Sequence, residues 1–286
     1  MRFFLVSLLC LTSALFASGA EKKEFVNSLG MRFVSVPAVA ERVSVWETRV
    51  QDFAAFVESS GYDATPGMRT FDGKTSEPVG RSWKDPGFDH TPEHPVCGVS
   101  WEDAKAFCAW LTATERKAGK IAANQAYDLP SDRLWSKIVG LGAEGAGTPK
   151  QKDALSLGNR QAKMGDIYPW GTQWPPPRGA GNYCGTESHA AATLEDYTDS
   201  HARTAPVGSY NPNQFGIYDL GGNVAEWCDD WYDETKAQRV IRGGSWGSNK
   251  PPTLLAADRI QVPPSFRLDK FGFRCILITT GGATSE

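Results

Sequence analysis

The chain from Arg242 to Arg274 reads RGGSWGSNKPPTLLAADRIQVPPSFRLDKFGFR. Its two ends combine glycines, which allow close backbone approach, with large side chains that can anchor them. Between the ends lie four prolines, and the apolar residues follow neither the period of a strand nor that of a helix. We therefore expect an irregular segment that is held at both ends. Long irregular segments inside a domain are usually functional.

The stretches on either side of this segment predict short elements separated by loops. Ser100 and Asp103 have the spacing of a capping box, which opens a helix. In chain order, we expect a hairpin within residues 25–45, a helix over 47–57, a surface loop over 60–94, a strand over 95–101, a helix from the Ser100 cap to Leu111, a helix after 129–132, a loop over 141–165, a strand at 240–242 and a closing strand at 273–278.

Composition narrows the class of protein. A formal net charge of -3 without a basic run argues against nucleic acid as a partner. The 10 Trp, 29 Gly and 18 Pro are typical of a loop-rich protein anchored by aromatic side chains, not of a helical bundle. A chain of this length buries roughly three quarters of its surface on folding, enough for a core without metal or disulfide staples. Since neither repeats nor a linker are visible, we expect one domain.

The first 20 residues have the organisation of a signal peptide. Arg2 precedes an apolar stretch that ends at Phe16, and small residues then lead to Glu21. The apolar stretch is too short to span a membrane. An alternative is a lipid anchor at Cys10, although Leu9 is bulkier than the residue usual before a lipidated cysteine. Both interpretations place the mature protein outside the cytoplasm: in the periplasm, at the cell surface or secreted. Residues 279–286 read as a polar tail.

Cysteine and histidine positions do not indicate a soft-metal site. Removal of residues 1–20 leaves an odd number of cysteines, so at least one thiol is free or paired with another chain. No two cysteines have the spacing of a zinc site, and the histidines are scattered. The remaining cysteines are Cys97, Cys108, Cys184, Cys228 and Cys275.

Six motifs together resemble the formylglycine-generating enzyme, or sulfatase-modifying factor, family. In order they are VSWEDAKAFCAWL, LPSDRLW, YPWG, TAPVGSYNPNQFGIYDLGGNVAEWCDDWYD, RVIRGGSW and FGFR, and the resemblance extends over residues 25–278. It implies a single domain of α+β class, related to C-type lectins, with little regular secondary structure and a twisted mixed sheet.

The resemblance also implies a disulfide and bound calcium. Cys108 and Cys275 fall on family positions that form a disulfide. Asn182 and Asp199, with the carbonyls of Tyr183 and His201, match one calcium site, and Asn223 and Glu226, with the Val224 carbonyl, match a second. Such hard oxygen donors suit Ca²⁺. The alternative is that Asp199 and Asn223 only cap turns.

Copper chemistry is not expected. Family members that oxidise cysteine bind copper through a cysteine pair shortly after the GGSW motif, because Cu(I) prefers soft thiolate ligands. This chain has no cysteine between Trp246 and Cys275. The cysteine positions fall near Pro252 and Ala257, whose side chains cannot ligate copper. An alternative is an oxidoreductase of the same family with an altered active site.

A narrower resemblance points to variable proteins diversified by a retroelement, of the treponeme type. Their skeleton between GGSW and GFR is matched here by Leu254, Ala257, Arg259, Pro264 and Arg267. We therefore expect a non-catalytic, monomeric binding protein whose ligand is a protein or glycan at a cell surface. A fixed structural subunit is a third reading. The expected recognition face, within 247–271 and beside Trp246, comprises Trp246, Gly247, Ser248, Asn249, Thr253, Asp258, Ile260, Val262, Ser265, Phe266, Leu268 and Asp269.

Four of these face residues are apolar. Ile260, Val262, Phe266 and Leu268 would form an exposed patch, and such patches often mark binding sites. The alternative is that these four side chains pack inward.

Overall fold

The computed structural model describes residues 24–70, 78–142, 144–153 and 166–281. The predicted signal peptide and Cys10 lie outside these ranges, as does most of the predicted tail. The helices are α1 (Val50–Ser60), α2 (Trp101–Lys117), α3 (Asp132–Val139) and α4 (Pro149–Asp153), with 3₁₀ turns η1 (Thr186–Ser188) and η2 (Pro251–Leu254). The strands are β1 (Phe25–Val26), β2 (Arg32–Ser35), β3 (Arg42–Ser44), β4 (Met68–Arg69), β5 (Pro78–Arg81), β6 (Gln125–Asp128), β7 (Ala225–Trp231), β8 (Arg239–Arg242), β9 (Arg259–Val262), β10 (Phe271–Gly272) and β11 (Ile276–Thr279).

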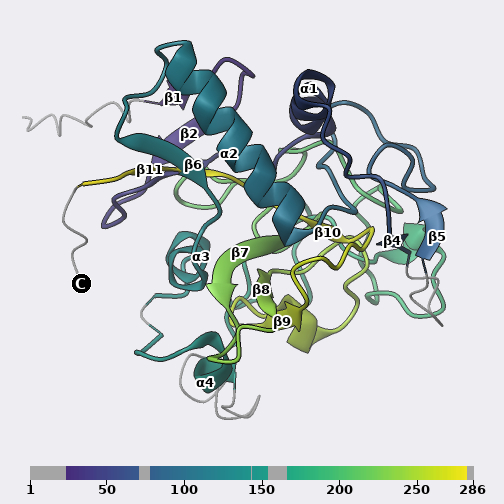
Figure 1. The fold of residues 1–286 in the computed structure, drawn as a ribbon. Coiled ribbons are helices and arrows are strands. Elements are labelled where there is room, and N and C mark those ends of the chain that lie inside the picture. The colour runs from purple at the N-terminus through teal and green to yellow at the C-terminus, as the bar shows by residue number, and fades with distance from the viewer. Residues whose placement is uncertain (1–23, 71–77, 143, 154–165, 282–286) are drawn as a thin grey trace, which may run out of the picture.

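Two sheets organise the molecule, and helix α2 contacts both (Figure 1). One sheet has the order β1-β2-β3-β11-β6 and is antiparallel throughout. The other has the order β10-β7-β8-β9 and is mixed, because β10 runs parallel to β7. The last two strands therefore belong to different sheets. β10 is an edge strand of the second sheet, and β11, which follows it, lies between β3 and β6 in the first.

Local capping explains where the main helices begin and end. Ser100 accepts a hydrogen bond from the Asp103 backbone N–H at 3.1 Å, and the Asp103 carboxylate accepts from the Ser100 N–H at 2.8 Å, which is the predicted capping box. Helix α3 starts at the Ser131 cap, and Gly140 ends it in the left-handed conformation (φ 88°). The glycine-rich stretch that begins at Gly140 is therefore a helix end.

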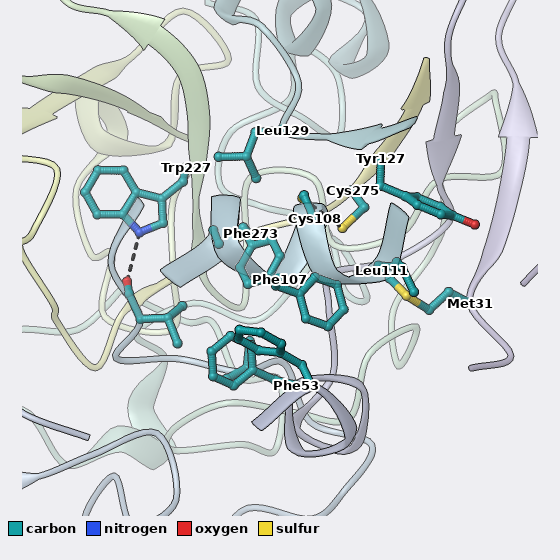
Figure 2. Close-up of a cluster of buried hydrophobic side chains, with 14 of the residues drawn as sticks. Met31, Phe53, Phe107, Cys108, Leu111, Tyr127, Leu129, Trp227, Phe273 and Cys275 are labelled. Atoms are coloured by element: carbon teal, nitrogen blue, oxygen red, sulfur yellow. Dashed lines mark hydrogen bonds between the residues drawn. The ribbon is translucent and has the colours of Figure 1, made fainter. Parts of the chain in front are cut away.

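The main core lies between α1, α2 and the two sheets (Figure 2). Phe53 and Phe107 stack with ring centroids 6.0 Å apart, and Phe273 meets Phe107 edge to face at 5.5 Å. Trp227, which is fully buried, donates its indole N–H to the Val99 carbonyl at 2.9 Å. Phe273 thus joins the C-terminal end of the Arg242–Arg274 segment to the core, and Trp227 on β7 joins the strand that pairs with β8 just before that segment.

Several sequence expectations on local structure are confirmed, and others are wrong. The first hairpin, helices α1 to α3, and strands β8 and β11 occur near the expected positions. Residues 60–94 are not only loop, since β4 and β5 pair there, and α4 interrupts the loop expected over 141–165. Residues 95–101 form no strand, and strand β6 was not expected. The mixed α+β class with little regular structure is confirmed.

Candidate functional site

The segment between Arg242 and Arg274 is more ordered than its sequence suggests. It leaves β8, turns at Trp246, forms η2, returns as β9 alongside β8 and enters β10. The expectation of an irregular backbone is therefore wrong for η2 and β9. Strand β9 lies at the edge of its sheet (Figure 1) and is only four residues long, with one residue buried, two half-buried and one exposed, so it is too short to show a sustained period.

Glycine is required at both ends of the segment. Gly243 has a φ of 82°, and a Cβ there would lie 2.9 Å from the Gly221 Cα. A Cβ on Gly272 would lie 2.6 Å from the Val96 carbonyl oxygen. Close backbone packing at the two ends is therefore confirmed.

Asp132, the first residue of α3, holds the first half of the segment. Its carboxylate accepts hydrogen bonds from Arg242 and, at 2.8 and 3.0 Å, from Arg259. All three side chains are almost completely buried. Burial alone would raise the pKa of Asp132, but the two guanidinium groups outweigh it and hold that pKa well below its usual range. Asp132 is thus an ionised anchor for the start of β9 and the end of β8.

Two further arginines anchor the second half in the same way. Arg267 makes a bidentate pair with the buried carboxylate of Asp103, at 2.7 and 2.8 Å. Arg274 pairs with Glu226 on β7, with both side chains fully buried and a closest distance of 2.6 Å. Such paired bonds fix direction as well as distance. The segment is therefore attached at four arginines to carboxylates from α2, α3 and β7.

The predicted face residues separate into buried and accessible groups. Trp246 and Asp269 are each only 4% exposed, so they are framework and not contact residues. The indole N–H of Trp246 donates to the Asp269 carbonyl at 3.1 Å, so Trp246 links the first part of the segment to its last part. Thr253 and Ser265 are exposed. The other predicted residues are half-buried: Gly247, Ser248, Asn249, Asp258, Ile260, Val262, Phe266 and Leu268.

The apolar face residues pack inward more than expected. Ile260, Val262, Phe266 and Leu268 lie against the main core as partly buried side chains. The expectation of an exposed apolar patch is therefore wrong, because the inner side of β9 and the turn after it help to cover the core. The most accessible side chains of the segment are polar or proline: Lys250, Pro251, Pro252, Thr253, Gln261, Pro263 and Ser265.

The first predicted calcium set is partly brought together. The Asp199 carboxylate accepts backbone N–H bonds from Tyr183 at 2.8 Å and from His201 at 3.0 Å. Burial raises the pKa of Asp199 to about 7, despite these two donors. Asn182 is fully buried, and its side-chain oxygen has no hydrogen-bond partner among the described residues. An orphaned buried oxygen of this kind fits a hard cation.

The second predicted calcium set does not fit. The Glu226 carboxylate is already bonded to Arg274 and to the Trp135 indole N–H. The amide of Asn223 bonds to Glu47, to both backbone groups of Ala205 and to Asn182. The side-chain oxygen atoms of Asn223 and Glu226 are therefore already used in hydrogen bonds within the protein and are not available as calcium ligands.

Sequence reasoning missed two buried carboxylates beside this second set. Glu47 accepts the Val224 N–H at 3.1 Å, and its pKa is raised well above the usual range by burial and then by the charges of Asp219 and Glu226. Asp219 is 6% exposed, and one of its carboxylate oxygens lacks a partner among the described residues. The available signal for Glu47 was a glutamate directly after the largely apolar residues 43–46 (VSVW).

The predicted cysteine pair is adjacent. The sulfur atoms of Cys108, on α2, and Cys275, just before β11, lie 3.8 Å apart as thiols in the main core (Figure 2). Their proximity is compatible with pairing, and the disulfide itself stays a prediction. Cys97, Cys184 and Cys228 are buried thiols.

Two small sheets, short helices and a long anchored segment define a domain of the C-type-lectin-related fold. The family model described as "Sulfatase-modifying factor enzyme 1-like domain" matches residues 40–278. The chain belongs to this sulfatase-modifying factor family. No helix in the described ranges is long and apolar enough to cross a membrane.

Relatives in this family differ in what their names state. The chain is 30% identical over 271 residues to the formylglycine-generating enzyme of Thermomonospora curvata, covering 79% of this chain and 78% of the relative. It is 29% identical over 210 residues to the inactive C-alpha-formylglycine-generating enzyme 2 of Bos taurus, covering 69% and 57%. Treponema denticola variable protein 1 has the same fold, with a TM-score of 0.51 and 17% identity over 89% of this chain and 98% of that one.

Proposed function

We propose that this protein is an exported, non-catalytic ligand-binding protein that presents residues 247–271 as its recognition face. The observation that carries the proposal is the anchoring of this segment by four arginines on three buried carboxylates. The anchors are separate from the accessible side chains of the segment. The partner would be a protein or glycan at a cell surface, bound by a monomer.

The chemistry of the segment supports binding over oxidation. Residues 247–271 contain neither cysteine nor histidine, so the segment has no soft ligand for copper. Its accessible residues offer one ammonium group, hydroxyl groups, an amide and rigid prolines. Substitutions at such surface positions usually change stability by less than about 0.5 kcal/mol. The face can therefore change its contacts while the anchors maintain the fold.

A quadruple alanine variant tests the proposed face. Lys250, Thr253, Gln261 and Ser265 are all exposed, so replacing them with alanine should leave the melting temperature close to that of the wild type. We expect wild-type protein to bind at least one member of an array of purified cell-surface proteins and glycans. The variant should lose that binding. A control variant with alanine at Glu58, Lys117 and Lys120, which are exposed and lie outside the segment, should retain it.

Three outcomes would contradict this proposal. One is that wild-type protein binds no member of the array, and another is that the quadruple variant binds as the wild type does. The third is catalysis, that is, conversion of the peptide substrate of the Thermomonospora curvata enzyme to an aldehyde by protein that has been loaded with copper.

We propose calcium as a structural ion at the Asn182 and Asp199 set. The orphaned Asn182 oxygen and the partly buried Asp199 carboxylate support it, and bound Ca²⁺ would stabilise the loop beneath Ser248, whose carbonyl accepts the Cys184 N–H. We expect an excess of chelator to lower the melting temperature of wild-type protein and to leave an Asp199→Asn variant unchanged. An unchanged wild-type melting temperature would sink this proposal.

A further inference from the structure

A cavity of about 420 Å³ lies on a part of the surface that the proposed recognition face does not use. Its walls come from the end of α3 near Gly140, the loop 167–180 and the turn 211–214. The volume falls within the roughly 300–1,000 Å³ of small-molecule sites. The cavity is therefore large enough for a sugar ring or a ligand of similar size.

Aromatic side chains form one wall. Tyr168 and Trp170 stack with their ring planes 3° apart and their centroids 4.8 Å apart. Trp174 lies against Tyr168 at 5.4 Å, and Trp174 is 40% exposed, one of two large apolar side chains this accessible among the described residues. The Trp170 indole N–H is bound to the Gln173 carbonyl at 2.8 Å, which holds the loop closed beside the rings. Tyr168 and Trp170 thus give the cavity an aromatic wall, and the exposed Trp174 packs against Tyr168 next to it.

Neutral polar groups also line the cavity. Asn211 and Gln214 line the cavity and are exposed, and an amide both donates and accepts hydrogen bonds. Asn213 also lines it, but its amide is already bonded: it donates to the Ile138 carbonyl on α3 and accepts from the Phe215 N–H. Asp219 is the one acidic residue among the described lining residues, and none of them is lysine or arginine.

We propose that this cavity binds a neutral saccharide. A sugar ring presents C–H faces, which pack on aromatic and proline surfaces, and hydroxyl groups, which both donate and accept hydrogen bonds as amides do. Asp219 adds an acceptor for a hydroxyl group. An anionic ligand is disfavoured, because it would meet a carboxylate and no cationic side chain among the described lining residues.

The cavity and the recognition face are linked but distinct. The Ile167 carbonyl, in the cavity wall, accepts the Ala256 N–H of the segment at 2.8 Å. Leu254 and Leu255 pack in the same cluster as Tyr168 and Tyr183. None of the exposed segment residues, such as Gln261, lines the cavity. Saccharide binding here would therefore survive changes that abolish binding at residues 247–271.

Ligand-observed NMR against glucose, galactose, mannose and N-acetylglucosamine tests the proposal, with affinities then measured by calorimetry. We expect at least one of these sugars to bind wild-type protein. An Asn211→Ala, Gln214→Ala double variant should weaken that affinity by about tenfold, as expected for the loss of two hydrogen bonds. A Trp174→Ala variant should weaken it as well. Each changed side chain is exposed, so folding can be verified by an unchanged melting temperature.

Asn124→Ala is the matched control, because it removes an exposed amide that belongs neither to the cavity lining nor to the recognition face, and it should keep the affinity for the sugar unchanged. Absence of binding by all four sugars would overturn the proposal, and so would equal affinity in the double variant. Binding of choline in place of the sugars would overturn it too, since the cavity would then recognise a cation through its aromatic wall. None of these outcomes would contradict the recognition face proposed at 247–271, which the quadruple alanine variant tests separately.

Discussion

Replacing Asp132 with asparagine is expected to lower the free energy of unfolding by about 3–5 kcal/mol. The change leaves Arg242 and Arg259 buried with one charge fewer to compensate them, and both side chains are fully buried. Lys152, which lies 3.0 Å from Asp132, loses the same partner. Urea unfolding followed by circular dichroism would measure the effect.

Asp85→Asn is the matched control. Asp85 pairs with Arg81 on the surface, where both side chains are well exposed, so the change should cost less than about 1 kcal/mol. Equal effects of the two substitutions would contradict the anchoring role of Asp132.

The Asp132 anchor also predicts a dependence on pH. Because the pKa of Asp132 is lower in the folded protein than in the unfolded chain, its contribution is complete above the unfolded value of about 3.9. That contribution is lost progressively as the pH falls below this value. Wild-type protein should therefore lose more stability than the Asp132→Asn variant between neutral pH and strongly acidic pH. Parallel pH profiles would contradict this assignment.

The second large effect is expected at Arg274. Its guanidinium group binds Glu226, the Tyr218 carbonyl at 2.9 Å and the Ser44 carbonyl at 3.3 Å, all in the interior. An Arg274→Met variant leaves the Glu226 carboxylate buried without its cation, beside the raised-pKa carboxyl of Glu47. We expect a loss of about 3–5 kcal/mol in the free energy of unfolding, measured in the same way.

A double variant separates the ion pair from simple loss of packing. Adding Glu226→Gln to Arg274→Met removes the uncompensated charge, so part of the stability should return. If the double variant is less stable than Arg274→Met by the full cost of the Glu226→Gln change alone, the two side chains do not act as a pair.

Local signals in the sequence predicted the helices well. The Ser100 capping box depends on a neighbour three residues away, so it can be read directly from the sequence. Strand β9 could not be read in this way, because its pattern reflects an edge position and pairing with β8. Strand β6 was hidden by its polar composition, although β11 pairs with it over four residues.

The candidate site was predicted in outline but not in its contacts. The anchoring residues Arg259 and Arg267 were recognised as skeleton, yet their partners Asp132 and Asp103 lie more than a hundred residues away in sequence. Glu47 was missed because its contact with Asn223 spans 176 residues. Such long-range pairs follow from packing and have no local pattern.

The spacing of the arginine anchors limits how the segment can change over evolutionary time. Arg242 and Arg259 face each other in the β8–β9 ladder and share one carboxylate, so the span between them has a set length. Removing or adding a single residue within β9 would shift its pairing with β8 and turn Arg259 to the opposite side of the sheet, away from Asp132. The anchored segment therefore tolerates amino-acid substitutions far more readily than insertions or deletions. Diversity in this protein is expected to accumulate by point substitution, with insertions and deletions confined to other loops.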